Sequence, residues 1–114
     1  MSTFFRDYFR AWDDLDLDGV LAFFTDDVVY EDTTIEHGAT GIAQMRKFVQ
    51  ASFENVPDAK FDHVGDVVSG DAFAVEWVMQ PMGVRGVSIG SLRDGKICKQ
   101  RDYWNGARFQ VPNT

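Results

Sequence analysis

The most regular feature of the chain is the alternation of apolar and polar residues in its second half. Successive side chains of a strand point to opposite faces of a sheet, so a period of two predicts strands. Asp94-Gly95 predicts a tight hairpin turn, because both residues tolerate positive φ, and Gly70-Asp71 predicts another turn. The four predicted strands, joined as antiparallel neighbours, are 60–69, 72–80, 84–93 and 96–104.

The first half of the chain has the spacing of amphipathic helices. Its first apolar residues recur at i, i+3, i+4 and i+7, which predicts a helix that Ser2 or Thr3 can cap. A short second helix follows from Asp18, and a third runs from Gly41 to about Phe53. The apolar residues that define the first helix are Phe5, Tyr8, Phe9 and Trp12.

The segments between these helices predict one further strand. A turn at Thr25-Asp26-Asp27 precedes this strand, which covers 28–32 and ends at Asp32. A polar loop from Thr33 to Gly38 leads to Thr40, which has the side chain of an N-cap. The order of elements predicts a single α+β domain over 1–114, with three helices packed on a mostly antiparallel sheet. The tail at 105–114 is predicted to be loose or packed across a neighbour.

Composition narrows the classes of function. The chain of 114 residues has ten Phe, three Trp and three Tyr, and these rings can fill a core or line an apolar pocket. A net charge of -7 argues against nucleic acid and anionic membranes as partners. The single Cys98 excludes an internal disulfide, and no ligand spacing indicates a metal. With no long apolar run and no leader pattern, we expect a cytoplasmic protein without metal or cofactor.

The last predicted strand contains the main candidate for chemistry. Its alternation places one set of side chains on one face and leaves the other set opposite. If the face with Asp102 points inward, a desolvated carboxyl with a raised pKa can transfer protons near neutral pH; if it points outward, Asp102 is ordinary surface charge. Alternation alone leaves this open. The first face holds Cys98, Gln100, Asp102 and Trp104; the second holds Ile97, Lys99, Arg101 and Tyr103.

Other side chains have two readings each. Tyr30 can donate a hydrogen bond to a developing oxyanion or lie at the core edge, and Asp32 on the same face is a base or a loop cap. His37 follows in a loop, where it is either exposed to solvent or a group that polarises a substrate carbonyl. His63 shares a face with Phe61, so it is either a proton donor facing the interior or a hydrogen-bonded core histidine. Trp77 either packs in the core or stacks on a ligand.

The order of elements, with three short motifs, resembles the SnoaL-like family of the NTF2-like superfamily, which has ketosteroid isomerase and limonene-epoxide hydrolase as relatives. This resemblance implies a cone-shaped, strongly curved sheet around a deep apolar pocket. It also implies a homodimer formed through the outer face of the sheet. The motifs are Val75-Glu76-Trp77, Arg85-Gly86-Val87-Ser88, and Asp94-Gly95-Lys96-Ile97 continuing to Arg101-Asp102-Tyr103-Trp104.

The resemblance assigns a role to Asp102. Polyketide cyclases of the family and limonene-epoxide hydrolase use an Asp on the last strand as general acid or acid/base, which implies that Asp102 faces the pocket. The epoxide hydrolases also carry an Arg and an Asp two residues apart, where this chain has Trp77 and Met79. The resulting site prediction has Asp102, Tyr30 and His63 as catalytic residues. The predicted substrate-binding residues are Trp77, Trp104, Asp32, His37, Gln100, Met79 and Trp12.

The predicted function is cofactor-independent acid/base catalysis on a small apolar carbonyl compound, aromatic or polycyclic. Asp102 would carry protons in an isomerase, aldol-type cyclase or lyase reaction. One alternative is a non-catalytic domain of the same fold that binds a small molecule or a protein. A second is a hydrolase similar to the epoxide hydrolases, with a base elsewhere, such as Asp32.

Overall fold

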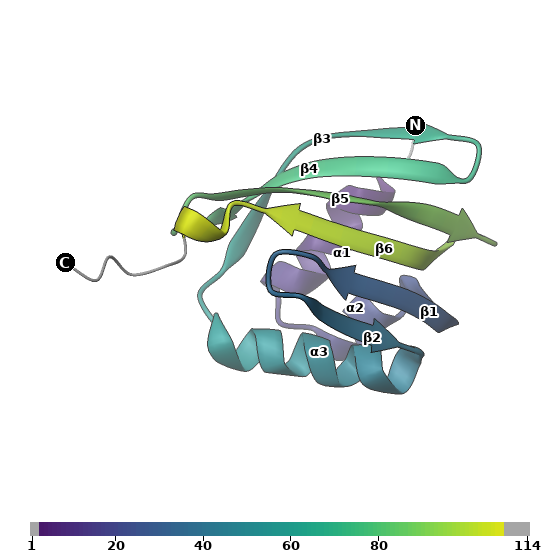
Figure 1. Cartoon of the computed structure of the whole chain (residues 1–114), viewed down its shortest axis with the longest axis horizontal. Coiled ribbons are helices and arrows are strands. Elements are labelled where there is room, and N and C mark those ends of the chain that lie inside the picture. Colours follow the sequence, from purple (N-terminus) through teal and green to yellow (C-terminus); the bar gives the residue numbers. More distant parts are fainter. Residues whose placement is uncertain (1–2, 109–114) are drawn as a thin grey trace.

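A computed structural model describes residues 3–108 and confirms the predicted α+β fold (Figure 1). Three α-helices pack on one side of a curved six-stranded sheet, and the chain then forms a short 3₁₀ helix. The helices are α1 (Phe4–Asp13), α2 (Leu17–Leu21) and α3 (Ile42–Asn55), and the 3₁₀ helix is η1 (Gly106–Arg108). The strands are β1 (Phe24–Asp32), β2 (His37–Thr40), β3 (Lys60–Ser69), β4 (Ala72–Gln80), β5 (Val84–Arg93) and β6 (Lys96–Trp104).

The last strand, β6, lies in the interior of the sheet. The strand order is β2-β1-β6-β5-β4-β3, with β1 and β6 parallel and all other neighbours antiparallel. In the parallel register Asp32 lies beside Asp102, and Tyr30 lies beside Gln100. Side chains from the two ends of the chain therefore share one part of the concave face, although about 70 residues separate them in sequence.

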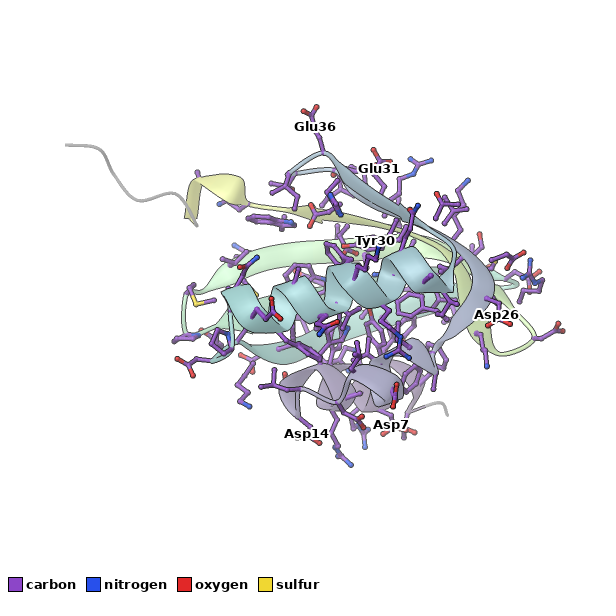
Figure 2. All side chains as sticks on the ribbon, turned by 90° about the horizontal axis from the view of Figure 1, so that it is seen from below. Asp7, Asp14, Asp26, Tyr30, Glu31 and Glu36 are labelled. Carbon is purple, nitrogen blue, oxygen red and sulfur yellow. The ribbon has the colours of Figure 1, made fainter. Side chains whose placement is uncertain are left out.

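The apolar core lies between the helices and the concave face of the sheet. Helix α1 buries Phe5, Tyr8 and Phe9 there, and α3 buries Met45 and Val49, which are four residues apart on one helix face. Acidic side chains lie on the outside instead: the five acids labelled in Figure 2 point away from the interior. The helical spacing of the apolar residues thus places their side chains on the face of each helix that packs on the sheet.

The structure corrects three predictions in the first half of the chain. The loop predicted between 33 and 38 is partly a strand, because β2 begins at His37 and pairs antiparallel with β1. Thr25–Asp27, predicted to be a turn, lies within β1, which begins at Phe24 and has an irregular register before Val29. The N-cap of α3 is Gly41 at φ +85 rather than Thr40. Polar composition indicated loops at places where pairing with β6 and β1 forms strands.

The simple alternation of β6 fails at its beginning. Ile97, predicted on the outer face, is fully buried in the core, and its backbone N–H donates to the Phe23 carbonyl. The register of β5 with β6 shifts between Leu92–Ile97 and Ser91–Lys99, so Cys98 is an extra residue in β6. A bulge of this kind reverses the inward and outward sides of the residues that precede it.

The predicted tail is only partly described. Asn105 is exposed and Gly106–Arg108 forms η1, which contradicts an entirely loose segment, while 109–114 lie outside the described residues. Over the described range, every helix is too short or too polar to span a bilayer.

Candidate functional site

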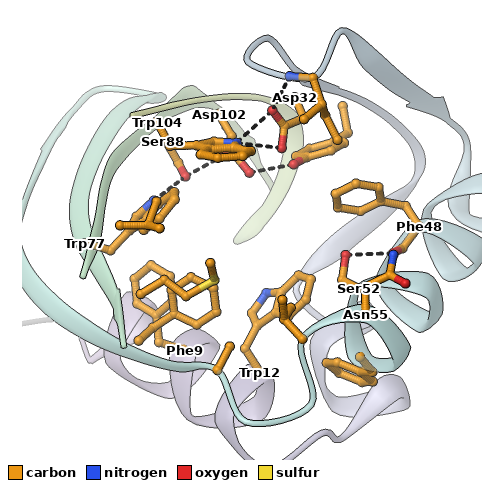
Figure 3. Close-up of a pocket in the computed structure, with 18 of the residues that line it drawn as sticks. Phe9, Trp12, Asp32, Phe48, Ser52, Asn55, Trp77, Ser88, Asp102 and Trp104 are labelled. Atoms are coloured by element: carbon orange, nitrogen blue, oxygen red, sulfur yellow. Dashed lines mark hydrogen bonds between the residues drawn. The ribbon is translucent and has the colours of Figure 1, made fainter. Parts of the chain in front are cut away.

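A cavity of about 350 Å³ opens between the concave face of the sheet and helices α1 and α3 (Figure 3). Aromatic rings form much of its wall, and all three tryptophans of the chain contribute. Rigid aromatic walls around a few polar groups are typical of small-molecule sites. The nine aromatic lining residues are Tyr8, Phe9, Trp12, Tyr30, Phe48, Phe53, Phe61, Trp77 and Trp104.

The carboxylate of Asp102 lines this cavity and accepts three hydrogen bonds. The Tyr30 hydroxyl donates to Oδ2 over 2.6 Å, and the Ser88 hydroxyl donates to Oδ1 over 2.6 Å. The Gln100 amide Nε2 donates to the same Oδ1 over 2.9 Å. These donors come from β1, β5 and β6, so three adjacent strands hold the carboxylate in one orientation.

Trp77 extends this cluster on β4. Its indole N–H donates to Ser88 Oγ over 3.0 Å, which leaves the Ser88 hydrogen free to point at Asp102. The ring has room because residue 86, directly opposite on β5, is glycine: a Cβ there would be 2.4 Å from the indole. Trp77 is buried, which agrees with core packing, and it also lines the cavity, so that stacking on a ligand stays a prediction.

The environment shifts the pKa values of the acids and phenols. Burial raises the pKa of Asp102 to about 6, while hydrogen bonds from Ser88, Tyr30 and Gln100 oppose that rise. Burial, and then the nearby Asp102 charge, raise the pKa of Tyr30 well above its ordinary value. The same two causes, in the same order, raise the pKa of Tyr8. Asp102 is thus the group of this cluster whose protonation changes near neutral pH.

Asp32 is a second carboxylate in the cavity, with different partners. The Trp104 indole N–H lies 2.9 Å from both of its oxygens, and the backbone N–H groups of Thr34 and Ile35 lie 3.1 and 3.3 Å from Oδ1. Asp32 is only 6% exposed. Its interactions match the predicted alternative of a loop-capping acid, while its position also places a negative charge at the cavity wall.

Most of the predicted site residues meet at this cavity. Gln100, Met79 and Trp12 line it, from β6, β4 and α1 respectively. His37 lines it from β2 and stacks on Phe48 of α3, with ring centroids 5.5 Å apart. The structure thus brings together Asp102, Tyr30 and all seven residues predicted to bind substrate.

His63 is the exception. It is an exposed residue that does not line the cavity, and its ring pairs with Asp66 at 2.7 Å instead. It faces the same side as Trp77 across the β3–β4 register, but the Phe9 ring packs on it with centroids 6.0 Å apart. Phe9 and Phe61 line both the cavity and the shallow cleft that contains His63. The prediction that His63 donates a proton in the site is therefore wrong, because His63 lies outside the cavity.

Ser88 and Phe48 are site residues that sequence reasoning did not identify. Ser88 lies directly opposite Asp102 in the β5–β6 register. Counting outward from the Asp94-Gly95 turn without a bulge would place Val87 opposite Asp102 instead, because the bulge at Cys98 shifts the register by one. Phe48 lies on α3, and no local signal distinguishes a ring that lines a cavity from one that fills a core.

Comparisons with known proteins define the family. The SnoaL-like domain family matches residues 5–100, which is most of the chain. The chain belongs to the SnoaL-like domain family. A comparison with curated proteins found no match.

Several solved structures have the same fold as this chain. A SnoaL-like protein of unknown function from Burkholderia thailandensis has a TM-score of 0.82 at 19% identity, covering 91% of this chain and 93% of that one. A provisionally assigned polyketide cyclase from Sinorhizobium meliloti has a TM-score of 0.76 at 19% identity, covering 90% and 95%. A provisionally assigned ketosteroid isomerase from Kribbella flavida has a TM-score of 0.75 at 23% identity, covering 98% and 82%.

The position of Asp102 predicts how the stability of this SnoaL-like domain depends on pH. Its pKa of about 6 exceeds the ordinary 3.8, so the folded chain binds this proton more tightly than the unfolded chain does. The resulting stabilisation is fully present below pH 3.8 and is lost as the pH rises through about 6. One pKa unit corresponds to about 1.4 kcal/mol, so the loss is on the order of 3 kcal/mol.

Urea unfolding of the wild type and Asp102→Asn at a series of pH values measures this contribution. The free energy of unfolding of the wild type should fall relative to that of the variant as the pH rises from about 4 to about 7. The difference between the two proteins isolates Asp102 from the other titrating groups. A difference that stays constant across this range would contradict the assigned environment of Asp102.

Proposed function

We propose that this protein is a cofactor-independent acid/base enzyme that moves a proton next to the carbonyl group of a small, largely apolar substrate. The observation that carries the proposal is the Asp102 carboxylate, held by three donors on the wall of an aromatic cavity. A proton carrier works best when its pKa lies near the working pH, and burial raises that of Asp102 to about 6. Isomerisation, aldol-type ring closure and carbon–carbon lysis share this step.

The neighbours of Asp102 have positioning roles in this proposal. The Tyr30 and Ser88 hydroxyls each donate to a different carboxylate oxygen, and they fix the plane of the carboxylate relative to the cavity. Since the Tyr30 hydroxyl donates its hydrogen bond to Asp102, we assign Tyr30 to orienting the base rather than to polarising the substrate. The indoles of Trp77 and Trp104 supply flat apolar walls against which a ring can stack.

Proton exchange tests the proposal without knowledge of the full reaction. A panel of aromatic and alicyclic ketones is incubated with the protein in heavy water, and deuterium incorporation next to the carbonyl is followed by NMR. We expect exchange above the buffer rate for at least one ketone, and loss of that exchange in Asp102→Asn. Exchange that continues unchanged in the variant would contradict Asp102 as the proton carrier.

A non-catalytic binding domain is the second candidate, and one observation favours it. Both carboxylate oxygens of Asp102 already accept hydrogen bonds, as do those of Asp32, so each acid also has the partners of a structural group. Binding of ketones by the wild type with no exchange for any of them would favour this candidate. Incorporation of labelled water oxygen into a product would instead favour the hydrolase alternative.

We also propose that the outer face of the sheet forms a homodimer interface. Val67, Ile89 and Tyr103 are 68, 38 and 39% exposed, they lie on β3, β5 and β6, and none of them lines the cavity. Light scattering after gel filtration should give the mass of two chains for the wild type and of one chain for Ile89→Asp. Leu15→Asp, an exposed apolar residue outside the sheet, is the matched control that should remain dimeric. A monomeric wild type would contradict the proposal.

A further inference from the structure

The charges of the cavity wall are unbalanced. Asp32 and Asp102 both line the cavity, and among the described residues that line it none is Lys or Arg. The other titratable lining groups are Tyr8, Tyr30 and His37. Two carboxylates in a partly enclosed, ring-lined space create a negative potential that solvent screens less than it does at an open surface.

The aromatic walls add to this potential. The face of an aromatic ring is the negative end of its quadrupole and attracts cations, most strongly in tryptophan. Trp12, Trp77 and Trp104 line the cavity from three different elements, so a ligand inside it has indoles on more than one side (Figure 3). The aromatic rings and the carboxylates therefore both favour a positively charged ligand.

Gln100 contributes an independent observation. Its side chain lines the cavity and is 2% exposed, and its carbonyl oxygen Oε1 is buried with no hydrogen-bond partner. Rotating the amide by 180° would not help, because Oε1 would then face Asp102 Oδ1 in place of the Nε2 donor. A buried acceptor without a donor is unfavourable, because it has lost its hydrogen bonds to water. The buried Tyr8 hydroxyl is close to the Gln100 side chain but does not form a hydrogen bond to Oε1, so this acceptor beside the central carboxylate has no donor in place.

We propose that the ligand of this cavity carries a protonated amine on a compact, ring-sized apolar body. The ammonium supplies the missing N–H donor to Gln100 and offsets the charges of Asp32 and Asp102, while the apolar part contacts the indoles. The inference rests on the proposed function in one respect, since it names the class of substrate for the same cavity: an amino-substituted carbonyl compound.

A neutral hydroxyl would satisfy only part of this arrangement. An alcohol can donate to Gln100 Oε1, but it leaves the two carboxylates uncompensated and gains little from the ring faces. Comparing the affinities for an amine and an alcohol of the same shape therefore measures the effect of the charge, separate from the effects of shape and of the hydrogen bond. We expect the charged form to bind about tenfold more tightly or better, which is the effect of one ion pair or cation–π contact in a partly desolvated site.

Isothermal titration calorimetry with two probes tests the proposal. Phenethylamine is protonated near neutral pH, and phenethyl alcohol is its uncharged counterpart of nearly the same shape. The wild type should bind the amine at least about tenfold more tightly than the alcohol. Equal affinities, a preference for the alcohol, or no binding of the amine would overturn the proposal, and this comparison needs no variant.

Two variants locate the charge that is responsible. Asp102→Asn should reduce the preference for the amine several-fold, because it removes a carboxylate and keeps the side-chain shape. Asp71→Asn removes one charge from an exposed turn outside the cavity and should leave the preference unchanged. An equal reduction in both variants would mean that the net charge of the protein, not the cavity, selects the amine, and would overturn the assignment.

This test and the test of the proposed function fail separately. Ketone exchange that depends on Asp102, together with equal binding of amine and alcohol, would retain the enzyme and reject the amine. Selective amine binding without any proton exchange would retain the ligand class and reject the catalysis.

Discussion

Turnover by Asp102→Asn is expected to be about 10² to 10⁴ times lower than that of the wild type, which is the usual contribution of a positioned acid/base group. The variant keeps the size of the side chain but cannot take up a proton at physiological pH. Asn can still accept hydrogen bonds from Ser88 or Tyr30 through Oδ1, so the cavity should keep its shape. The loss should therefore appear mainly in kcat.

Two comparisons make the result interpretable. Asp71→Asn changes the net charge by the same amount at an exposed turn and should retain wild-type turnover within about twofold. Near-ultraviolet circular dichroism reports whether the tryptophans that line the cavity stay in place in Asp102→Asn. A folded Asp102→Asn with turnover close to that of the wild type would exclude Asp102 as the proton carrier.

Gly90→Ala is expected to destabilise the fold by more than about 3 kcal/mol, an exceptional loss for the addition of one methyl group. Gly90 pairs with Gln100 across β5–β6 and with Phe73 across β4–β5. A Cβ at this position would be 1.9 Å from the Lys99 carbonyl oxygen and 2.9 Å from the Phe73 ring. Since the first of these atoms belongs to the backbone, a change of side-chain rotamer cannot relieve the overlap.

Gly65→Ala is the matched control. It makes the same substitution in β3, where a Cβ would meet no atom within 4 Å and φ is not in the left-handed region. Alanine is favoured over glycine inside a strand by about 0.5–1 kcal/mol, so this variant should be as stable as the wild type or slightly more stable. Chemical denaturation measures both variants. A Gly90→Ala protein with a midpoint close to that of Gly65→Ala would show that β5 and β6 can separate there without cost.

Local patterns predicted the second half of the fold because its rules are local. The alternation over 60–104 and the Asp94-Gly95 turn identify β3 to β6, since adjacent antiparallel strands need only short connections. The apolar spacing of α1 likewise identifies the rings at Phe5, Tyr8 and Phe9 as buried. The local pattern could not predict that Asp102 points inward, because alternation divides a strand into two faces without indicating which face is covered.

The features that were missed depend on long-range pairing. β2 is a strand because β1 supplies its hydrogen bonds, and nothing in its own composition of His, Gly, Ala and Thr predicts one. The bulge at Cys98 moves Ile97 into the core and sets Ser88 opposite Asp102, and both follow from how β6 packs between two neighbours. His63 has the alternation of an inward residue, but Phe9 of α1 covers the space between it and the cavity.

The interior position of β6 has a consequence for biosynthesis. During synthesis β1 emerges from the ribosome about 70 residues before its parallel partner, so until Lys96–Trp104 appear the edges of β1 and β5 that β6 will cover both have unpaired backbone groups. Closing so long a loop is slow and contributes strongly to contact order. The nascent chain can form its helices and the β3–β5 meander early, but the sheet becomes continuous only when its last strand is inserted. Asp32 and Asp102 become neighbours in that same step, so the cavity forms together with the completed fold.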